Sequence, residues 1–368
     1  MTKLCCIFNT PSLYRESIYQ CIEEEYDCDW YFEDTNNKLK TFDTSQFNSV
    51  IYLHARFFGP FYWVNGILKL LLRKEYKQYL MMGHSRNLST LCFLLIKTLF
   101  FPHKKAYLWT HGLYGKESCL EYLWKKMLLG LADELLIYGD YACSLMKEAG
   151  FNPKRLHAIH NSLSYDVQLQ LRKQMKASDI YKNHFGNNNN PVIVFIGRLT
   201  TVKKLHMLVQ AIALLKQRDN LYNVAFIGDG SEMAELKRLS KNLGVESQIW
   251  FYGACYDEKT NAELIYNADL CVAPGNIGLT AMHVLMFGCP VITHDDFTYQ
   301  MPEFEAVKPN KTGNFFIKDN IQSMTDEIEA WFSTNKNLRE RVRKECYKEI
   351  DTQWNPKYQM KILQSVIE

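Results

Sequence analysis

The stretch Val192-Ile-Val-Phe-Ile196-Gly197-Arg198-Leu199-Thr-Thr-Val-Lys203-Lys204 decides the fold of this 368-residue chain. Its five consecutive apolar residues are typical of a strand buried on both faces of a parallel sheet. A glycine turn follows, and Leu205–Gln217 then has the periodicity of an amphipathic helix. A strand, a turn and a helix in this order form the repeating unit of a doubly wound α/β sheet.

The turn itself is basic, and this predicts an anion site. Backbone N–H groups at the start of a helix have no intrahelical partner and attract anions. Arg198 can bind a phosphate through two donors, and Lys203 adds a compact charge. A solvated basic turn is the alternative, and this turn alone does not decide between the two.

The same alternation of strands and helices extends in both directions. Strands are expected in the second half at Val224–Ile227, Gln248–Tyr252, Leu270–Ala273 and Pro290–His294, with helices at Ser231–Leu243 and Asn261–Tyr266. Strands are expected in the first half at Leu4–Phe8, Val50–Leu53, Tyr79–Met82, Ala106–Trp109 and Glu134–Tyr138, with helices at Leu13–Tyr26 and Lys116–Leu131. This pattern predicts two parallel sheets, each covered by helices.

We therefore expect two facing Rossmann-like domains, at 1–165 and 166–350. The polar run Asn183–Asn190 predicts a surface loop. A last amphipathic helix is expected over 351–368, with the N-terminal domain as its candidate partner. Ligands of doubly wound sheets bind at the carboxyl ends of the strands, so the site is expected there.

Composition excludes several classes of protein. The net charge of +3 is too small for a dedicated nucleic-acid binder. The eleven cysteines include no Cys-x-x-Cys pair, which favours a reducing compartment and argues against a zinc site. No signal peptide is recognised, and the longest apolar stretch, Leu91–Phe101, is too short to span a bilayer. A cytoplasmic protein is expected.

Two further glycine loops follow predicted strands. The first is Ile227-Gly228-Asp229-Gly230-Ser231, where glycines permit close backbone approach to a ligand. The second is Pro274-Gly275-Asn276-Ile277-Gly278-Leu279-Thr280-Ala281-Met282-His283, which leads into a helix ending near Gly288. A tight turn without a ligand and a locally satisfied helix histidine are the respective alternatives.

Taken together, these motifs resemble the family-4 retaining glycosyltransferases of the GT-B fold. The matching motifs, in order, are Gly197–Lys203, Gly228–Gly230, Tyr266–Asp269, Gly275–Ile292, Pro302-Glu303 and Thr312-Gly313. They cover most of the C-terminal half, whereas the N-terminal half matches loosely, as expected for an acceptor-binding domain.

The resemblance implies roles for single residues. Arg198 and Lys203 would bind the donor diphosphate, and the Leu279 and Thr280 amides would meet phosphate. The segment 228–230 (Gly228, Asp229, Gly230), together with Gly197, Tyr252 and Gly278, would line the nucleotide pocket. In the first half, Trp109-Thr110-His111-Gly112 resembles the strand end whose histidine, here His111, faces the transferred sugar.

One departure concerns the two glutamates that the family places eight residues apart. Counting back from Gly288 and Pro290, those places hold Gly275 and His283. His283 still offers a hydrogen bond to the nucleotide ribose, and Asn276 stands beside the sugar-contacting position. Candidates for a substitute carboxylate are Asp295, Asp296, Glu303 and Glu305, and the residue pattern does not choose among them.

The resemblance implies a retaining hexosyltransferase without a cofactor or metal, acting in bacterial cell-surface polysaccharide or lipopolysaccharide synthesis. The donor is a nucleoside-diphosphate sugar and the acceptor a saccharide, free or lipid-linked. Asp27-Cys28-Asp29 has metal-binding spacing but lies outside the matched half. A sugar-nucleotide epimerase and a nucleotide-sugar binder without catalysis are the alternatives.

Aromatic and basic residues gather in the first half. They occupy Arg56–Trp63, Leu68–Lys77, Phe93–Lys105 and Tyr122–Lys126. Such mixtures suit an anionic membrane surface, which would make the protein peripheral at the inner face of the membrane. A core helix with solvated lysines explains the same pattern.

Overall fold

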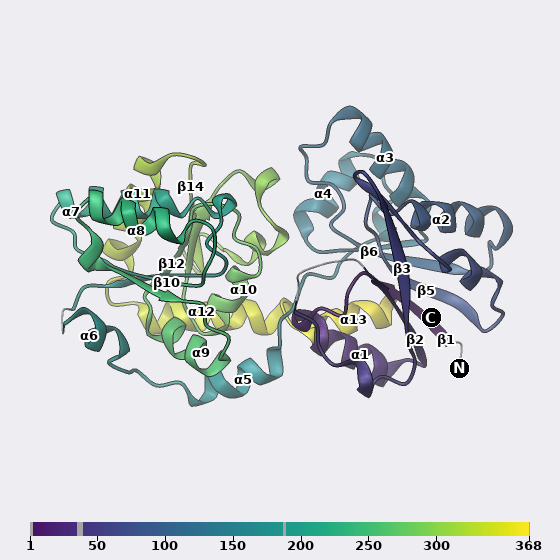
Figure 1. The fold of residues 1–368 in the computed structure, drawn as a ribbon, viewed down its shortest axis with the longest axis horizontal. Coiled ribbons are helices and arrows are strands. Elements are labelled where there is room, and N and C mark those ends of the chain that lie inside the picture. Colours follow the sequence, from purple (N-terminus) through teal and green to yellow (C-terminus); the bar gives the residue numbers. More distant parts are fainter. Residues whose placement is uncertain (1–2, 35–39, 187–188, 368) are drawn as a thin grey trace. The chain divides into compact units, whose positions relative to one another are not determined.

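The computed structural model describes residues 3–34, 40–186 and 189–367. These residues form two compact units, one made of residues 1–164 and 355–368 and the other of residues 165–354. Each unit is a sheet of mainly parallel strands with helices on both faces (Figure 1). The predicted fold class, two Rossmann-like domains, is confirmed.

The first unit has an eight-stranded sheet in the order β4-β3-β2-β1-β5-β6-β7-β8. Its strands are β1 Lys3–Phe8, β2 Cys28–Asp34, β3 Val50–Phe58, β4 Phe61–Val64, β5 Tyr76–Met82, β6 Lys105–Thr110, β7 Glu134–Ile137 and β8 Leu156–Ala158. All neighbours pair in parallel except β3 and β4, which form an antiparallel hairpin.

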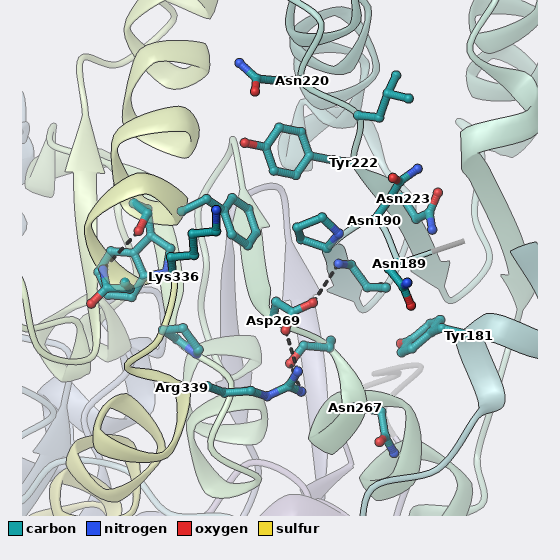
Figure 2. A pocket seen from close by; sticks show the side chains of 18 of the residues that line it. Tyr181, Asn189, Asn190, Asn220, Tyr222, Asn223, Asn267, Asp269, Lys336 and Arg339 are labelled. Atoms are coloured by element: carbon teal, nitrogen blue, oxygen red, sulfur yellow. Dashed lines mark hydrogen bonds and ion pairs between the residues drawn. The ribbon is translucent and has the colours of Figure 1, made fainter. Parts of the chain in front are cut away.

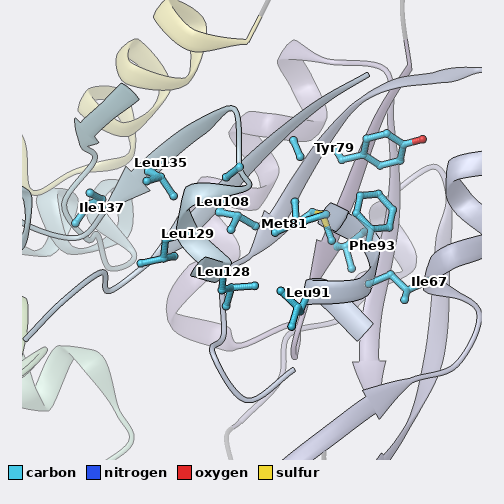
Figure 3. Packing of buried hydrophobic residues seen from close by; sticks show 14 of the residues in the cluster. Ile67, Tyr79, Met81, Leu91, Phe93, Leu108, Leu128, Leu129, Leu135 and Ile137 are labelled. Atoms are coloured by element: carbon cyan, nitrogen blue, oxygen red, sulfur yellow. The ribbon is translucent and has the colours of Figure 1, made fainter. Parts of the chain in front are cut away.

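Alternate residues of β1 serve the two faces of this sheet. Cys5 and Ile7 join a cluster with α2 (Leu88–Phe100), α3 (Cys119–Gly130) and α4 (Asp140–Glu148), part of which is drawn in Figure 3. Leu4, Cys6 and Phe8 join the opposite cluster, with α1 (Glu16–Glu25) and α13 (Pro356–Val366). The cysteines of this strand are therefore core residues.

The second unit has a six-stranded parallel sheet in the order β11-β10-β9-β12-β13-β14. The strands are β9 Val192–Ile196, β10 Asn223–Ile227, β11 Ile249–Gly253, β12 Leu270–Ala273, β13 Val291–His294 and β14 Gly313–Phe316. The helices are α5 Tyr165–Gln174, α6 Ile180–Phe185, α7 Leu205–Gln217, α8 Met233–Asn242, α9 Glu258–Asn267, α10 Thr280–Met286, α11 Ile321–Asn335 and α12 Arg339–Gln353. Helix α7 packs with α8 and α11, and α10 packs with α5 and α12.

Several element predictions need correction. The helix expected from 351 begins only at Pro356, because α12 runs to Gln353 and the Asn355 side chain caps α13 by accepting the Tyr358 N–H. The loop expected at Asn183–Asn190 is in part α6, and residues 187–188 lie outside the described residues. Strand β2 was missed because it carries buried acids.

Buried Asp29 of β2 is stabilised by partners on two other strands. Asp29 forms an ion pair of 2.8 Å with Lys3 and accepts a hydrogen bond from Tyr76. Asp29 is therefore held within the sheet by these two contacts.

Candidate functional site

The sequence-predicted donor residues gather at one edge of the second sheet. Strands β9, β10, β11 and β12 are neighbours and parallel, so the loops after Ile196, Ile227, Gly253 and Ala273 meet at their carboxyl ends. His111 belongs to the first unit, where it follows β6.

The loops after β9 and β10 touch through their backbones. A Cβ at Gly228, whose φ is +151°, would lie 1.9 Å from the Gly197 carbonyl oxygen, and one at Gly230 would lie 2.2 Å from that of Leu199. The Leu199 N–H donates to the Asp229 carbonyl at 2.9 Å. These glycines are thus required by contact between two loops, a reason that the sequence pattern did not reveal.

The two predicted cations lie in different surroundings. The Arg198 side chain is exposed, and within the described residues it has no hydrogen-bond or ion-pair partner. Lys203 is partly buried, and its Nζ donates to the Asn276 carbonyl at 2.6 Å and to Asn276 Oδ1 at 2.8 Å. Lys203 thereby connects the β9 turn to the loop after β12.

Burial and charge set the protonation of Lys203. Burial lowers its pKa to about 8, Glu303 opposes this, and Arg198 adds to it. A lysine with a lowered pKa beside an arginine indicates a local excess of positive charge, which favours an anion at this edge of the sheet.

Gly275 has no room for a side chain. Its N–H donates to the Lys203 carbonyl at 3.0 Å, and a Cβ would lie 2.1 Å from the Val202 carbonyl oxygen. The close approach of these two loops accounts for the missing first glutamate.

His283 has a carboxylate partner that sequence reasoning missed. Its Nε2 lies 2.9 Å from Glu258 Oε1, and Gln168 Nε2 donates to the same oxygen at 2.8 Å. Burial would raise the pKa of Glu258, but the His283 and Gln168 contacts outweigh it and the pKa is lowered. The carboxylate comes from the first turn of α9, and no motif within the 275–283 loop could have pointed to it.

Gln300, a second residue that sequence reasoning missed, holds the loop after β12 in place. Gln300 Oε1 accepts the Ile277 N–H at 3.0 Å, and its Nε2 donates to Thr293 Oγ1 at 2.8 Å. Gly278 follows with a φ of +56°. Buried Gln300 therefore fixes the loop before any ligand arrives.

Helix α10 starts at this loop. Thr280 Oγ1 donates to the Ile196 carbonyl at the end of β9, at 2.9 Å. Among the described residues, the N–H groups of Leu279 and Thr280 have no protein acceptor. These donors are available to an anion at the same edge that holds Arg198 and Lys203.

The proposed substitute carboxylates are not equivalent. Asp296 forms an ion pair with Lys318 at 2.6 Å, and Asp295 accepts the Lys318 N–H at 3.0 Å. Glu303 is buried, and its charge acts on Lys203. Glu303 is therefore the acid of this group that belongs electrostatically to the candidate site.

His111 lies among aromatic rings at the carboxyl end of β6. Its ring centroid is 4.5 Å from that of Tyr138 and 5.8 Å from that of Tyr114. Burial, followed by the positive charges of Arg15, His84 and Lys125, lowers the pKa of His111 to about 3. At neutral pH the imidazole is uncharged, and its buried Nδ1 has no protein partner in the described chain.

A separate groove of 950 Å³ lies at the opposite ends of the second sheet (Figure 2). It is lined where β9, β10 and β12 begin, for instance by Asn223 and Asp269. Asp269 accepts the Val192 N–H at 2.8 Å and forms an ion pair with Arg339. These polar groups support the fold, so we place the groove outside the candidate site.

Residues 178–349 match the family model described as glycosyl transferases group 1. The D-inositol 3-phosphate glycosyltransferase of Corynebacterium glutamicum is 29% identical over 161 residues, which cover 40% of this chain and 37% of that protein. The uncharacterized glycosyltransferase MJ1607 of Methanocaldococcus jannaschii is 24% identical over 157 residues, 42% of this chain and 39% of that protein. The matches thus span well under half the length of these curated relatives.

Solved structures agree over the whole chain. Anabaena Alr3699/HepE in complex with UDP is similar with a TM-score of 0.74 and 15% identity, covering 99% of both chains. The lipopolysaccharide outer core galactosyltransferase WaaB has a TM-score of 0.71 and 14% identity, again covering 99% of both. The fold of this chain is that of the GT-B glycosyltransferases.

Proposed function

Because residues 178–349 match the family model of glycosyl transferases group 1, we propose that this protein moves a hexose-type sugar from a nucleoside-diphosphate sugar to a saccharide acceptor. The observation that carries the proposal is the convergence of Arg198, Lys203 and the Leu279–Thr280 amides on one sheet edge. Bacterial cell-surface polysaccharide or lipopolysaccharide synthesis is the proposed setting.

The donors at this edge suit the leaving group of the reaction. When the bond between the sugar C1 and the phosphate oxygen breaks, negative charge builds on the diphosphate. Preorganised cations and amides stabilise that charge and lower the barrier. Arg198 and Lys203 supply the charge, so the proposed reaction is metal-independent.

The acceptor oxygen then bonds to C1 from the leaving-group side, and its proton passes to the departing phosphate oxygen. This course retains the anomeric configuration, as the family resemblance implies. His111 is uncharged at neutral pH, and we assign it a hydrogen bond to a hydroxyl of the transferred sugar.

The nucleoside is assigned to the His283–Glu258 pair. The family resemblance places a ribose-binding glutamate at position 283, and here the carboxylate stands one hydrogen bond further away, on α9. Anabaena Alr3699/HepE has been solved with UDP-glucose, which makes uridine nucleotides the first donors to test.

The test is a thermal-shift screen of nucleoside diphosphates and their sugars, followed by product analysis with and without saccharide acceptors. A bound ligand raises the melting temperature by an amount that grows with its excess over Kd. Transfer that requires the acceptor supports the proposal. Turnover of the donor alone would favour an epimerase, and binding without any turnover would favour a non-catalytic binder.

We also propose that helix α3 rests on an anionic membrane that presents a lipid-linked acceptor. Buried Lys125 of this helix forms an ion pair with Glu117. Leu120 and Leu123 lie on the exposed side, with 81% and 60% of their surface accessible to solvent. Exposed Lys116 and Lys126 flank this apolar stripe. No helix of the described chain is long and apolar enough to cross a bilayer.

Sedimentation with vesicles containing anionic phospholipid tests the membrane proposal. The Leu120→Ser/Leu123→Ser variant should lose binding, whereas Leu221→Ser, which removes an exposed leucine from the second unit, should retain it. Equal sedimentation of the two variants would contradict a role for α3.

A further inference from the structure

Arg15 is a buried cation without a buried anion. Its side chain lies in the first unit, just before α1, and the residue is 5% exposed. Its Nη1 donates to the Tyr19 hydroxyl at 3.2 Å, and its Nη2 donates to the Tyr138 hydroxyl. Within the described residues no carboxylate forms an ion pair with it.

Aromatic rings, rather than a carboxylate, surround the Arg15 guanidinium. The guanidinium carbon lies 5.5, 5.7 and 5.6 Å from the ring centroids of Tyr14, Trp109 and Tyr138. Burial would lower the pKa of Arg15, but contacts with Tyr19 and Tyr14 outweigh burial and raise it, so the residue stays charged. Ring faces stabilise a cation without neutralising it, and a positive potential therefore remains at this place.

That potential acts on His111. Trp109 precedes His111 by two residues at the end of β6, and the Tyr138 ring lies against both side chains. One phenol thus touches the guanidinium through its hydroxyl and the imidazole through its ring.

The other charged groups near His111 are weaker candidates for this effect. Lys125, on α3, is paired with Glu117 at 2.8 Å and with Glu121 at 3.2 Å. His84 follows β5, and burial together with the charges of Arg86 and Lys125 lowers its own pKa, which disfavours its charged form. Arg15 is thus the permanent charge near His111 for which the described chain supplies no counter-ion.

We propose that Arg15 is a positioning residue, which orients the His111 ring through Tyr138 and disfavours its protonation, so that a neutral nitrogen faces the substrate. The chemical need is specific, because an imidazolium beside a developing sugar cation would oppose the reaction. The inference rests on the proposed role of His111 toward the transferred sugar.

The experiment follows the histidine NMR titration of the full chain between pH 3.5 and 8, with His111→Asn used to assign the signal. In the wild type and in Arg15→Lys, which keeps the charge, His111 should not titrate within this range. In Arg15→Met, the titration should shift upward by roughly one pH unit or more. Tyr138→Phe keeps the ring beside His111 but loses the hydroxyl that meets Arg15. This variant therefore tests whether Arg15 orients the His111 ring through Tyr138.

Kinetics provide the second readout. Arg15→Met should move the acid limb of kcat/KM upward, and Arg15→Lys should restore the wild-type profile. An unchanged His111 titration in folded Arg15→Met would overturn the proposal. If Arg15→Met does not fold, the Arg15→Gln titration decides in the same way. The titration requires no transfer activity, so failure of the proposed reaction would be seen separately as absence of product.

Discussion

At the scale of single residues, the two cations assigned to the proposed diphosphate site lie in different surroundings. Arg198 is exposed and unpaired in the described chain, whereas Lys203 is held by Asn276 before a ligand arrives. A charge held in place requires less reorganisation during the reaction. Lys203 is therefore expected to matter more for the transition state than for binding.

We predict that Arg198→Ala or Lys203→Ala lowers kcat by roughly two or more decades, the scale of removing one charge-stabilising donor. Lys204→Ala is the matched control, because Lys204 is paired with Asp319 at the protein surface. Steady-state kinetics on folded variants provide the measurement. Near-normal turnover by both variants would contradict the assignment of the phosphate site.

The pKa of Lys203 predicts a pH dependence. Because this pKa is lowered to about 8, the charged form prevails below that pH and is lost above it. Affinity for a nucleoside diphosphate should therefore fall as the pH rises from 7 to 10. Lys203→Arg should bind with little change over this range, since arginine stays charged. Calorimetric titration at several pH values tests both, and a flat wild-type profile would argue against Lys203 as a phosphate ligand.

Glu258 gives a third prediction at this scale. Glu258→Gln should weaken nucleoside diphosphate binding roughly 10- to 100-fold, as expected when a charged hydrogen-bond partner is lost. The 2′,3′-dideoxy nucleotide should bind the wild type and the variant alike, because it lacks the hydroxyls. A similar loss for both ligands would indicate a structural role for Glu258.

At the scale of elements, loop packing decides which residues the site can hold. Gly275 is close to the Val202–Lys203 backbone, and Gly228 is close to Gly197. Regular structure was largely predictable, since the apolar runs of β9, β12 and β13 are continuous and buried. Strand β2 was not, because its buried Asp29 is satisfied by Lys3 and Tyr76 from two other strands, which no local pattern reveals.

Gly275→Ala should destabilise the protein by about 1–3 kcal/mol, the usual cost of overpacking, and should lower activity by separating Lys203 from Asn276. Gly130→Ala is the control, since nothing lies within 4 Å of a Cβ at that position. Denaturant unfolding and kinetics of the two variants test this. Wild-type behaviour of Gly275→Ala would show that the loop has room for a side chain.

At the scale of the whole molecule, the last helix completes the first unit although it is distant in sequence. Gln359 Oε1 accepts the Ser162 hydroxyl at 2.6 Å, and its Nε2 donates to the His160 carbonyl at 3.1 Å. Leu363 is fully buried in the cluster that contains Ile18 and Tyr19. Along the sequence, the second unit is thus inserted between the two segments that form the first unit.

Leu363→Ala should destabilise the first unit by about 2–5 kcal/mol, the range for removing a buried leucine. Hydrogen exchange followed by mass spectrometry should show faster exchange in β1 and α1, with β9 and β10 unchanged. Gln364→Ala, at an exposed position of the same helix, should leave exchange unchanged. Uniformly faster exchange in both units would indicate that they unfold together.

The sequence by itself determined the fold class and the order of the glycine and basic motifs, because both depend on local periodicity and on spacing along the chain. The resemblance to GT-B glycosyltransferases followed from that order. Tertiary structure alone decided that Lys203 binds Asn276, that Gly275 cannot carry a side chain, and that His283 meets Glu258. The physical reason is that parallel strands bring loops from distant positions to one edge, where contacts depend on pairing order.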